Sequence, residues 1–456
     1  MKRGKKFLIL LGVLAVLLGA AAAAPLLTPE EQPVQEPEAV TVFSVEPEQL
    51  SGISWTLEEQ TLSFGIGDDG WYYVDDAVFP VEGSALEEMK EALLEIVAEK
   101  VIDAPEEPEN YGLLRPACTV TVTAGDETRQ LQIGDTSAVD GLRYLSVGDG
   151  KVYLVDSSLY DRFNYGLYDL VAMETVPEME GITECVVETA EQTLTLEYRE
   201  NSGIAYSDSY VWFAREGGEL LAADTELTES FLSAITGLAW ESCVEYNADG
   251  EALKGYGLDA AAVTVTVGYG DSGEQSFSVE MGLTDDGCYA RLPGSGMVYE
   301  IDSALAEGLL YTTYMELQPD EVLRMDWDTV ETVTAELEGE SYTFLRQLKE
   351  VTDGDGNVTR EAVYLLGEEE LALQDILDTV EAMASTGYAN GAAPQRNPEL
   401  RLVFTTTGET FPEICLTFCR HDSSSCLVQL NGESTVFVSR EDVVALKEAI
   451  TALVLD

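Results

Sequence analysis

The chain of 456 residues repeats itself at a nearly constant spacing. The tripeptide Tyr-Gly-Leu at residues 111–113 recurs at residues 256–258, about 145 positions later (256 minus 111). A fainter third copy of the same pattern ends near residues 436–440. Such regular spacing indicates that one structural unit has been multiplied, and it limits the chain to folds that can be built from similar repeats.

Each repeat is predicted to contain strands, then one helix, then further strands. The alternating run at residues 60–66 is typical of a strand, whereas the apolar spacing from Ser84 to Lys100 is typical of a helix that begins with a capping box. This order lacks regular βαβ alternation, so it predicts an α+β fold of mainly antiparallel sheet with one packed helix per repeat. We place repeat 1 at residues 41–176, repeat 2 at 177–322 and a degenerate repeat 3 at 323–456.

The first 27 residues predict a membrane segment. A basic cluster between Lys2 and Lys6 precedes an uncharged apolar run at residues 7–27, which is long enough to cross a bilayer as a helix. The run is either a retained transmembrane anchor or a signal peptide cleaved near residues 21–24. Residues 28–40, rich in Pro and Glu, follow as an extended tether. Both alternatives place the bulk of the chain outside the cytoplasm, and a retained anchor makes it a single-pass protein of the cell membrane.

The charge balance limits the partners of the chain. It has 24 Lys and Arg residues against 85 Asp and Glu residues, which gives a formal net charge of −61. Repulsion on this scale disfavours nucleic acid and anionic lipid headgroups. We therefore expect no nucleic-acid partner, and we expect contact with the membrane through the N-terminal helix.

The residue pattern predicts no catalytic, metal-binding or cofactor-binding set. The acidic loop that starts at Asp353 lacks the Gly and Glu that an EF-hand needs at its sixth and twelfth positions. Seven cysteines at irregular spacing are not typical of a disulfide framework. Cys419 and Cys426 flank a polar loop, and they either form a disulfide across a hairpin or remain free thiols.

Aromatic residues occupy similar places in the first two repeats. Trp71 and Tyr73 lie in a strand-like segment of repeat 1, and Trp212 stands 141 positions after Trp71 (212 minus 71). Alternation puts Trp71 and Tyr73 on the same face of the strand. These residues either pack in the core or form an exposed aromatic strip that binds a partner or a glycan.

The chain resembles the bacterial family of domain of unknown function 4340. The resemblance rests on turn and strand motifs, namely Gly70-Trp71-Tyr72-Tyr73, Tyr111-Gly112-Leu113, Thr119-Val120-Thr121-Val122 and Ile133-Gly134-Asp135. It implies a single-pass extracytoplasmic protein of the kind associated with ABC-2 type export permeases and with the gliding-motility type of auxiliary subunit. The motifs carry no catalytic residue to transfer.

These observations lead to one functional expectation and two alternatives. We expect a non-enzymatic, membrane-anchored extracytoplasmic accessory protein that binds a partner, namely an ABC-type export complex. The first alternative is a structural protein of the cell envelope whose aromatic residues bind glycan. The second is a hydrolase of unknown substrate, which would require a deep polar pocket.

Overall fold

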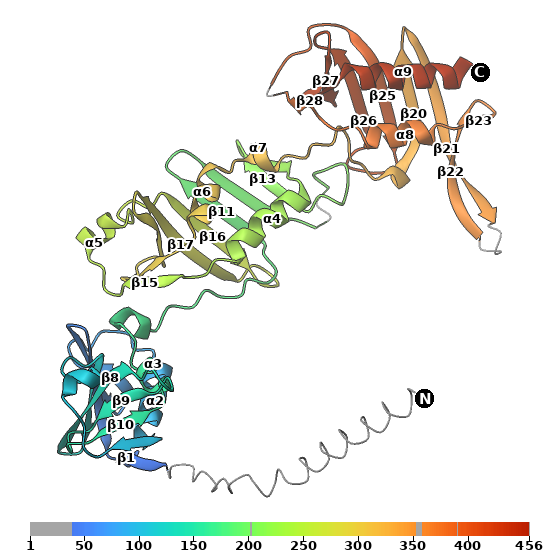
Figure 1. The fold of residues 1–456 in the computed structure, drawn as a ribbon. Helices are drawn as coiled ribbons and strands as arrows, with labels where there is room; N and C mark the ends of the chain where they lie inside the picture. The colour runs from blue at the N-terminus through green and yellow to red at the C-terminus, as the bar shows by residue number, and fades with distance from the viewer. Residues whose placement is uncertain (1–38, 201–202, 353–357, 390, 456) are drawn as a thin grey trace, which may run out of the picture. The chain divides into compact units, whose positions relative to one another are not determined.

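The computed structural model describes residues 39–200, 203–352, 358–389 and 391–455 (Figure 1). The chain divides into two compact units, Met1–Met173 and Glu174–Asp456. The predicted membrane segment and most of the predicted tether lie outside the described residues. Within the described ranges, no helix is both long and apolar enough to cross a membrane.

Repeat 1 is an eight-stranded antiparallel sheet with the strand order β4-β3-β2-β7-β8-β9-β10-β6. A separate two-stranded sheet pairs β1 (Val40–Ser44) with β5 (Glu95–Ala98), so the predicted tether ends in a strand at Val40. The strands of the large sheet are β2 (Leu50–Leu57), β3 (Gln60–Gly67), β4 (Gly70–Tyr73), β6 (Lys100–Ile102), β7 (Cys118–Ala124), β8 (Glu127–Thr136), β9 (Arg143–Ser146) and β10 (Val152–Val155). The helices are α2 (Gly83–Leu94), η1 (Pro108–Tyr111), α3 (Ser158–Asp161) and η2 (Leu167–Leu170).

Repeat 2 is a nine-stranded sheet with the order β14-β13-β12-β11-β16-β17-β18-β19-β15. Its strands are β11 (Glu184–Thr189), β12 (Thr193–Tyr198), β13 (Trp212–Glu216), β14 (Glu219–Ala222), β15 (Ser242–Glu245), β16 (Val263–Tyr269), β17 (Gln275–Thr284), β18 (Gly287–Arg291) and β19 (Val298–Glu300). Its helices are α4 (Thr225–Thr236), α5 (Gly250–Gly255), α6 (Ser303–Tyr311) and α7 (Tyr314–Leu317).

Repeat 3 has the same order as repeat 2, position by position: β23-β22-β21-β20-β25-β26-β27-β28-β24. Its strands are β20 (Val330–Leu337), β21 (Glu340–Thr352), β22 (Val358–Leu366), β23 (Glu369–Leu371), β24 (Gly387–Tyr388), β25 (Pro398–Thr406), β26 (Glu413–Arg420), β27 (Ser425–Leu430) and β28 (Glu433–Ser439). Its helices are η3 (Trp327–Thr329), α8 (Gln374–Glu381) and α9 (Arg440–Leu455). Repeat 3 is therefore complete in topology, although its sequence has drifted.

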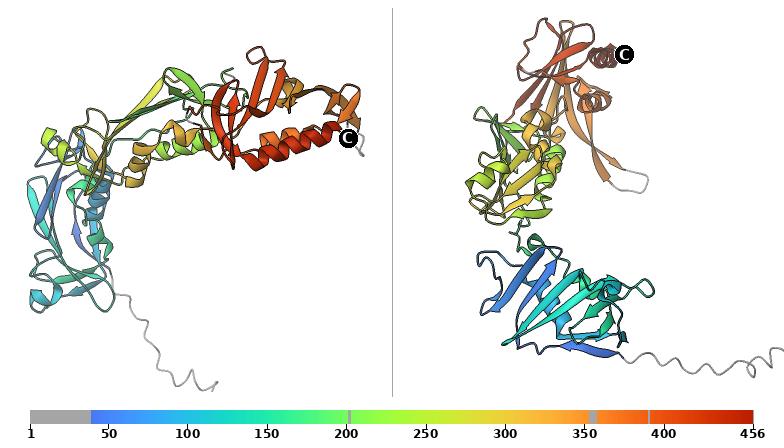
Figure 2. Two further views of the ribbon diagram at one scale, coloured as in Figure 1. Left: turned by 90° about the horizontal axis from the view of Figure 1, so that it is seen from above. Right: turned by 60° about the vertical axis from the view of Figure 1, so that its left-hand side comes forward.

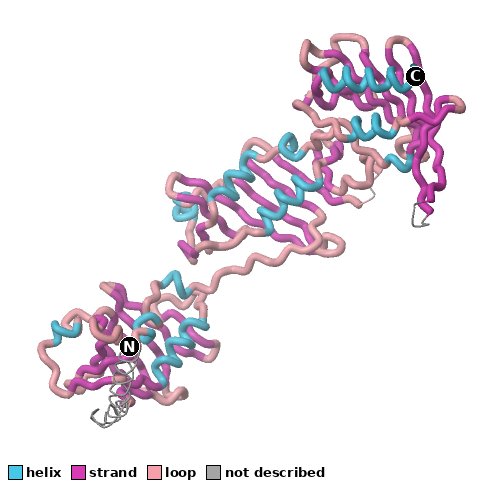
Figure 3. Tube along the Cα trace, turned by 45° about the vertical axis from the view of Figure 1, so that its right-hand side comes forward, coloured by secondary structure: helices cyan, strands magenta, loops and turns pink. Residues whose placement is uncertain are grey.

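The longer helices of each sheet lie on one face, and the core forms between them and the sheet (Figure 3). The short helices η1 and α5 end against the opposite face, where their last tyrosines contact Tyr144 and Tyr289. In β16 the side chains of Val263, Val265 and Val267 point to this face and are fully buried, as strict alternation predicts. The same core takes Leu232 from α4 and Leu309 from α6. The prediction of one packed helix per repeat was therefore too low, since repeat 2 packs two helices on its sheet.

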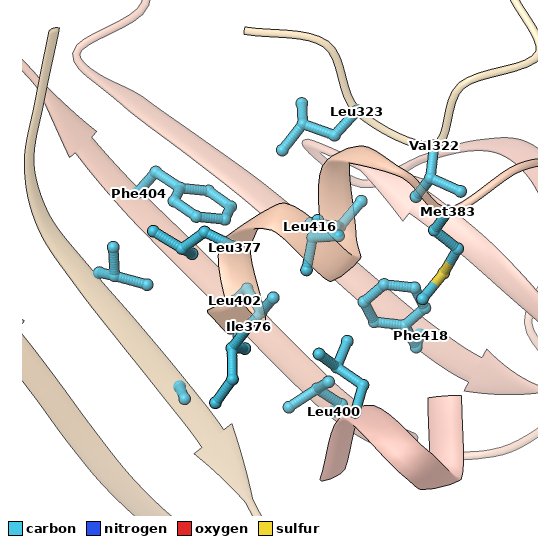
Figure 4. Close-up of a cluster of buried hydrophobic side chains, with 14 of the residues drawn as sticks. Val322, Leu323, Ile376, Leu377, Met383, Leu400, Leu402, Phe404, Leu416 and Phe418 are labelled. Carbon is cyan, nitrogen blue, oxygen red and sulfur yellow. The ribbon is translucent and has the colours of Figure 1, made fainter. Parts of the chain in front are cut away.

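Repeat 3 is built in the same way. Leu377 of α8 packs with Leu402, Phe404 and Leu416 of the sheet (Figure 4). The second helix, α9, lies along the same sheet and buries Leu446 in this cluster (Figure 2). On the opposite face the central strands carry polar residues such as Thr264 and Thr266 of β16, whereas Phe213 and Leu427 are buried on that face.

The first helix of repeat 1 is shorter than predicted. It begins after Glu82, whose carboxylate accepts the Ser84 N–H, and it ends at Leu94 instead of continuing to Lys100. The following residues form β5, because they pair with β1. In β5 the side chain of Ile96 is buried and those of its two neighbours are exposed, as in a strand. Ile96 therefore fits the observed strand as well as the predicted helix.

Repeat 1 also lacks one strand that the other two repeats contain. In repeats 2 and 3 the strands β14 and β23 complete the edge of the sheet. The corresponding segment of repeat 1 forms a bridge between Val81 and Val171 instead. Two backbone hydrogen bonds flank this bridge: the N–H of Ala172 donates to the carbonyl of Pro80, and the N–H of Glu82 donates to the carbonyl of Leu170, both at 2.7 Å. Among the described residues, β4 therefore forms the edge of its sheet.

Candidate functional site

The repeated Tyr-Gly-Leu tripeptide ends a helical turn in both repeats. In repeat 2 the N–H of Leu258 donates to the carbonyl of Leu253, and Gly257 has a φ of 69°. In repeat 1 the N–H of Leu113 donates to the carbonyl of Pro108, and Gly112 has a φ of 68°. This is the Schellman cap, in which a left-handed residue stops the helix and the next residue packs as a hydrophobe. The glycine is required because other residues rarely adopt that φ.

A second glycine, in the neighbouring strand, lets this cap lie directly on the sheet. A Cβ atom built on Gly134 of β8 would come under 3.0 Å from the carbonyl oxygen of Tyr111. A Cβ atom on Gly282 of β17 would meet the carbonyl oxygen of Tyr256 in the same way. The two tyrosine rings then pack edge-on against Tyr144 and Tyr289, at centroid distances of 5.0 and 4.8 Å. The repeated motifs of the first two repeats therefore hold the fold together.

Repeat 3 has a cysteine where the other repeats have this glycine. The pairing of Leu400 with Phe418 corresponds to that of Val263 with Met281, so Cys419 corresponds to Gly282. Cys419 packs with Ala389 and Leu427 in a small apolar cluster.

Of the two alternatives for Cys419 and Cys426, a disulfide or free thiols, the structure has free thiols. Cys419 pairs with Leu427, whereas Cys426 pairs with Arg420, so the two thiols point to opposite faces of the hairpin. Cys426 belongs to the large core and Cys419 to the small cluster on the other side.

The predicted aromatic residues occupy equivalent positions in the sheets. Trp71 pairs with Ile66, Trp212 with Tyr198, and a third aromatic residue, Tyr364, with Arg346. Tyr73 lies in the core of repeat 1, with its ring 5.2 Å from that of Phe64.

An acidic residue accompanies this aromatic position in each repeat. It stands five residues after the N-cap of the first helix: Glu87 after Glu82, Glu229 after Asp224, and Asp378 after Leu373. Sequence reasoning missed these acids because each is one of 85. The signal that could have found them is the spacing from Trp71 to Glu87 and from Trp212 to Glu229, which is 16 and 17 residues.

In repeat 1 the aromatic residue and the acid bind each other. The indole N–H of Trp71 donates to Glu87 at 2.7 Å. Burial acts against the charged form of Glu87, but the hydrogen bonds from Trp71 and Lys90 dominate and lower its pKa. The indole N–H of the half-buried Trp71 is thus satisfied by an acceptor within its own repeat.

In repeat 2 the same two positions line a groove of about 630 Å³ at the end of the sheet. Leu232 of α4 and Trp212 of β13 form its apolar base, and Tyr198 of β12 stands at its side with its ring 5.4 Å from that of Trp212. Glu229 of α4 and Asp271, in the turn after β16, supply carboxylates. The backbone carbonyl of Trp212 accepts the N–H of Ala223 at 2.9 Å, whereas its indole N–H donates to no described residue. We take this groove, beside Trp212, as the candidate functional site.

The remaining titratable groups form no reactive cluster in the described ranges, and no group of three or more His, Cys, Asp or Glu residues there could hold a metal ion. His421 packs its ring 4.7 Å from that of Phe437. The carboxylate of Asp422 accepts the backbone N–H groups of Ser424 and Ser425, which lower its pKa to about 2. These residues shape a turn.

The fold defines a class of protein: a chain of repeated α+β units, each built on a mainly antiparallel sheet. The sequence model of a family described as Domain of unknown function (DUF4340) matches residues 71–203 and 212–401, more than two thirds of the chain. The chain therefore belongs to this family, as its turn and strand motifs predicted. A search of curated proteins found no match.

Proposed function

We propose that the chain is an extracytoplasmic accessory protein that binds a partner, and that this partner is an ABC-type export complex. The observation that carries the proposal is the difference between the two faces of the sheet in each repeat. The longer helices cover one face of each sheet, and the Tyr-Gly-Leu caps cover the opposite face only beside β8 and β17. The polar strands on the rest of that opposite face are therefore available for contact with a partner.

The free faces have the chemistry of reversible binding surfaces. Cross-strand hydroxyl pairs lie on them in each repeat: Thr56 with Thr61 at 2.8 Å, Thr266 with Ser278 at 3.0 Å, and Thr334 with Thr343 at 3.0 Å. A surface with such hydroxyl rows is compatible with water when no partner is bound, and its hydroxyl groups can donate and accept hydrogen bonds when a partner covers it. They suit a partner that docks on a folded surface.

The test is purification of the tagged full-length protein from the native membrane in nonionic detergent. The expected result is an ABC-2 type permease subunit in stoichiometric amount, with a reciprocal pull-down from the tagged permease. The control is an unrelated single-pass protein with the same tag and a similar expression level. Recovery of the protein without permease in both directions would refute the proposal.

A further inference from the structure

We propose that the groove beside Trp212 binds a lysine or arginine side chain carried by an extended segment of the partner. The inference rests on the proposed function, because it names the chemistry by which one repeat would recognise that partner.

The groove has the shape and lining that a long basic side chain needs. Its base is apolar, with Met179 and Leu232 beside Trp212, and such a surface packs against the methylene stem of lysine or arginine. Tyr198 is 41% exposed, so its ring is available to a cation.

Two carboxylates lie where the charged end of such a side chain would come to rest. Glu229 and Asp271 line the groove, and no lysine or arginine lines it with them. Neither carboxylate takes part in an ion pair with a described residue. In a chain with a net charge of −61, a cation entering this site is attracted both by the two acids and by the surrounding field.

Trp212 adds a hydrogen-bond donor to the groove. Its side chain is only 4% exposed, but its indole nitrogen is not among the fully buried polar atoms that lack a partner, and it donates to no described residue. Its counterpart Trp71 donates to Glu87 at 2.7 Å, so the same pair of positions is satisfied internally in repeat 1. The free indole N–H can donate to a backbone carbonyl of the bound segment.

The observations favour a basic peptide over a sugar. A sugar and a cation can both contact the exposed ring of Tyr198, so the charge of the groove decides between them. A neutral sugar would gain nothing from the acidic field, whereas a cation would gain most at low salt.

Binding of fluorescein-labelled penta-lysine to the full-length protein in nonionic detergent tests the proposal, with penta-serine as the neutral probe. The groove variant combines Glu229→Gln and Asp271→Asn. The matched control combines Asp285→Asn and Asp286→Asn, which removes the same charge from the exposed turn between β17 and β18. We expect at least tenfold weaker penta-lysine binding in the groove variant, less than twofold in the control, and loss of binding as salt is raised.

A third variant, Trp212→Phe, keeps one aromatic ring in the core and removes the indole N–H together with the second ring of the indole. We expect it to weaken penta-lysine binding about threefold to tenfold with an unchanged circular dichroism spectrum. Equal losses in the groove and control variants would show non-specific attraction and overturn the proposal. Salt-independent binding of chitotetraose that Trp212→Phe abolishes would also overturn it, in favour of a glycan site.

The same variants separate this inference from the proposed function. If permease co-purifies with the wild type and with the groove variant in equal amounts, the groove is not the recognition site, while the accessory role stands. If the wild type binds penta-lysine through the groove but recovers no permease, the accessory role fails and the groove stands.

Discussion

Replacing Gly282 with alanine should destabilise repeat 2 by about 3 kcal/mol, although the change adds only a methyl group. The new Cβ atom would lie under 3.0 Å from the carbonyl oxygen of Tyr256 and 2.8 Å from the carbonyl carbon and oxygen of Gly257. All of these are backbone atoms, so no side-chain rotation relieves the overlap. The helix cap has to move away from the strand.

The magnitude follows from what that movement disturbs. Overpacking in a close-packed site costs about 1–3 kcal/mol. Separation of the Tyr256 and Tyr289 rings, now 4.8 Å apart, adds about 0.5–1.5 kcal/mol. Leu258 is 1% exposed, and partial exposure of its side chain adds about 1 kcal/mol. Because one displacement causes all three losses, they overlap, and we expect about 3 kcal/mol in total.

Gly308→Ala is the matched control, because this glycine lies in α6 of the same repeat and a Cβ there meets nothing within 4 Å. It should stabilise the protein by about 0.4–1 kcal/mol. The assay is urea unfolding of the full-length protein followed by tryptophan fluorescence, with hydrogen exchange of peptides covering residues 250–262 as the local measurement. If Gly282→Ala unfolds at the same urea concentration as Gly308→Ala and keeps its exchange protection, the reasoning is wrong.

Three further predictions concern thiols and a buried ion pair. Denatured, non-reduced protein should be alkylated at both Cys419 and Cys426; a disulfide-linked peptide pair in the mass spectrum would contradict the opposed faces. In the native protein, Cys426 should be alkylated very slowly at pH 8, because burial raises its pKa to about 11, and rapid labelling would show that the core opens readily. Glu197→Gln should cost about 1–2 kcal/mol at pH 7, since burial opposes the carboxylate but bonds from Arg199 and Arg215 lower its pKa below 4.5. That contribution is complete above the unfolded pKa of Glu197 and is lost as the pH falls through its lower folded pKa. Urea unfolding should therefore show the two proteins converging in acid, below the ordinary titration range of a glutamate, and a constant difference would refute the assignment.

The repeat and the fold class could be predicted from the sequence because both appear as local patterns of residues. Alternation in β16 gives a strand, and Val263, Val265 and Val267 are buried on one face as that pattern requires. The end of α2 was missed because Ile96 fits a helix spacing as well as a strand alternation, and pairing with β1, more than 50 residues earlier, decided the outcome. The order of the strands is non-local in the same sense, since β2 pairs with β7 across the whole first helix.

The candidate site was predicted in part. Trp212 was singled out from its spacing to Trp71, but Glu229 and Asp271 were not distinguishable among 85 acids. They come together only when α4 and the turn after β16 are folded against the same end of the sheet. The possible disulfide failed for a related reason: the distance along the chain between Cys419 and Cys426 suits a hairpin, but the register decides on which face each thiol lies.

Comparison of the repeats separates residues that the fold requires from residues that are free to acquire a function. Gly134 and Gly282 admit the same backbone contact in two repeats, so they belong to the fold. Trp71 and Trp212 share a register position but not a contact, since only Trp71 donates its N–H within its own repeat. A multiplied unit can therefore pair such a residue within one copy and leave its counterpart without that pairing in another, as Trp71 and Trp212 show. The departure from the repeat, more than the repeat itself, therefore identifies the groove beside Trp212.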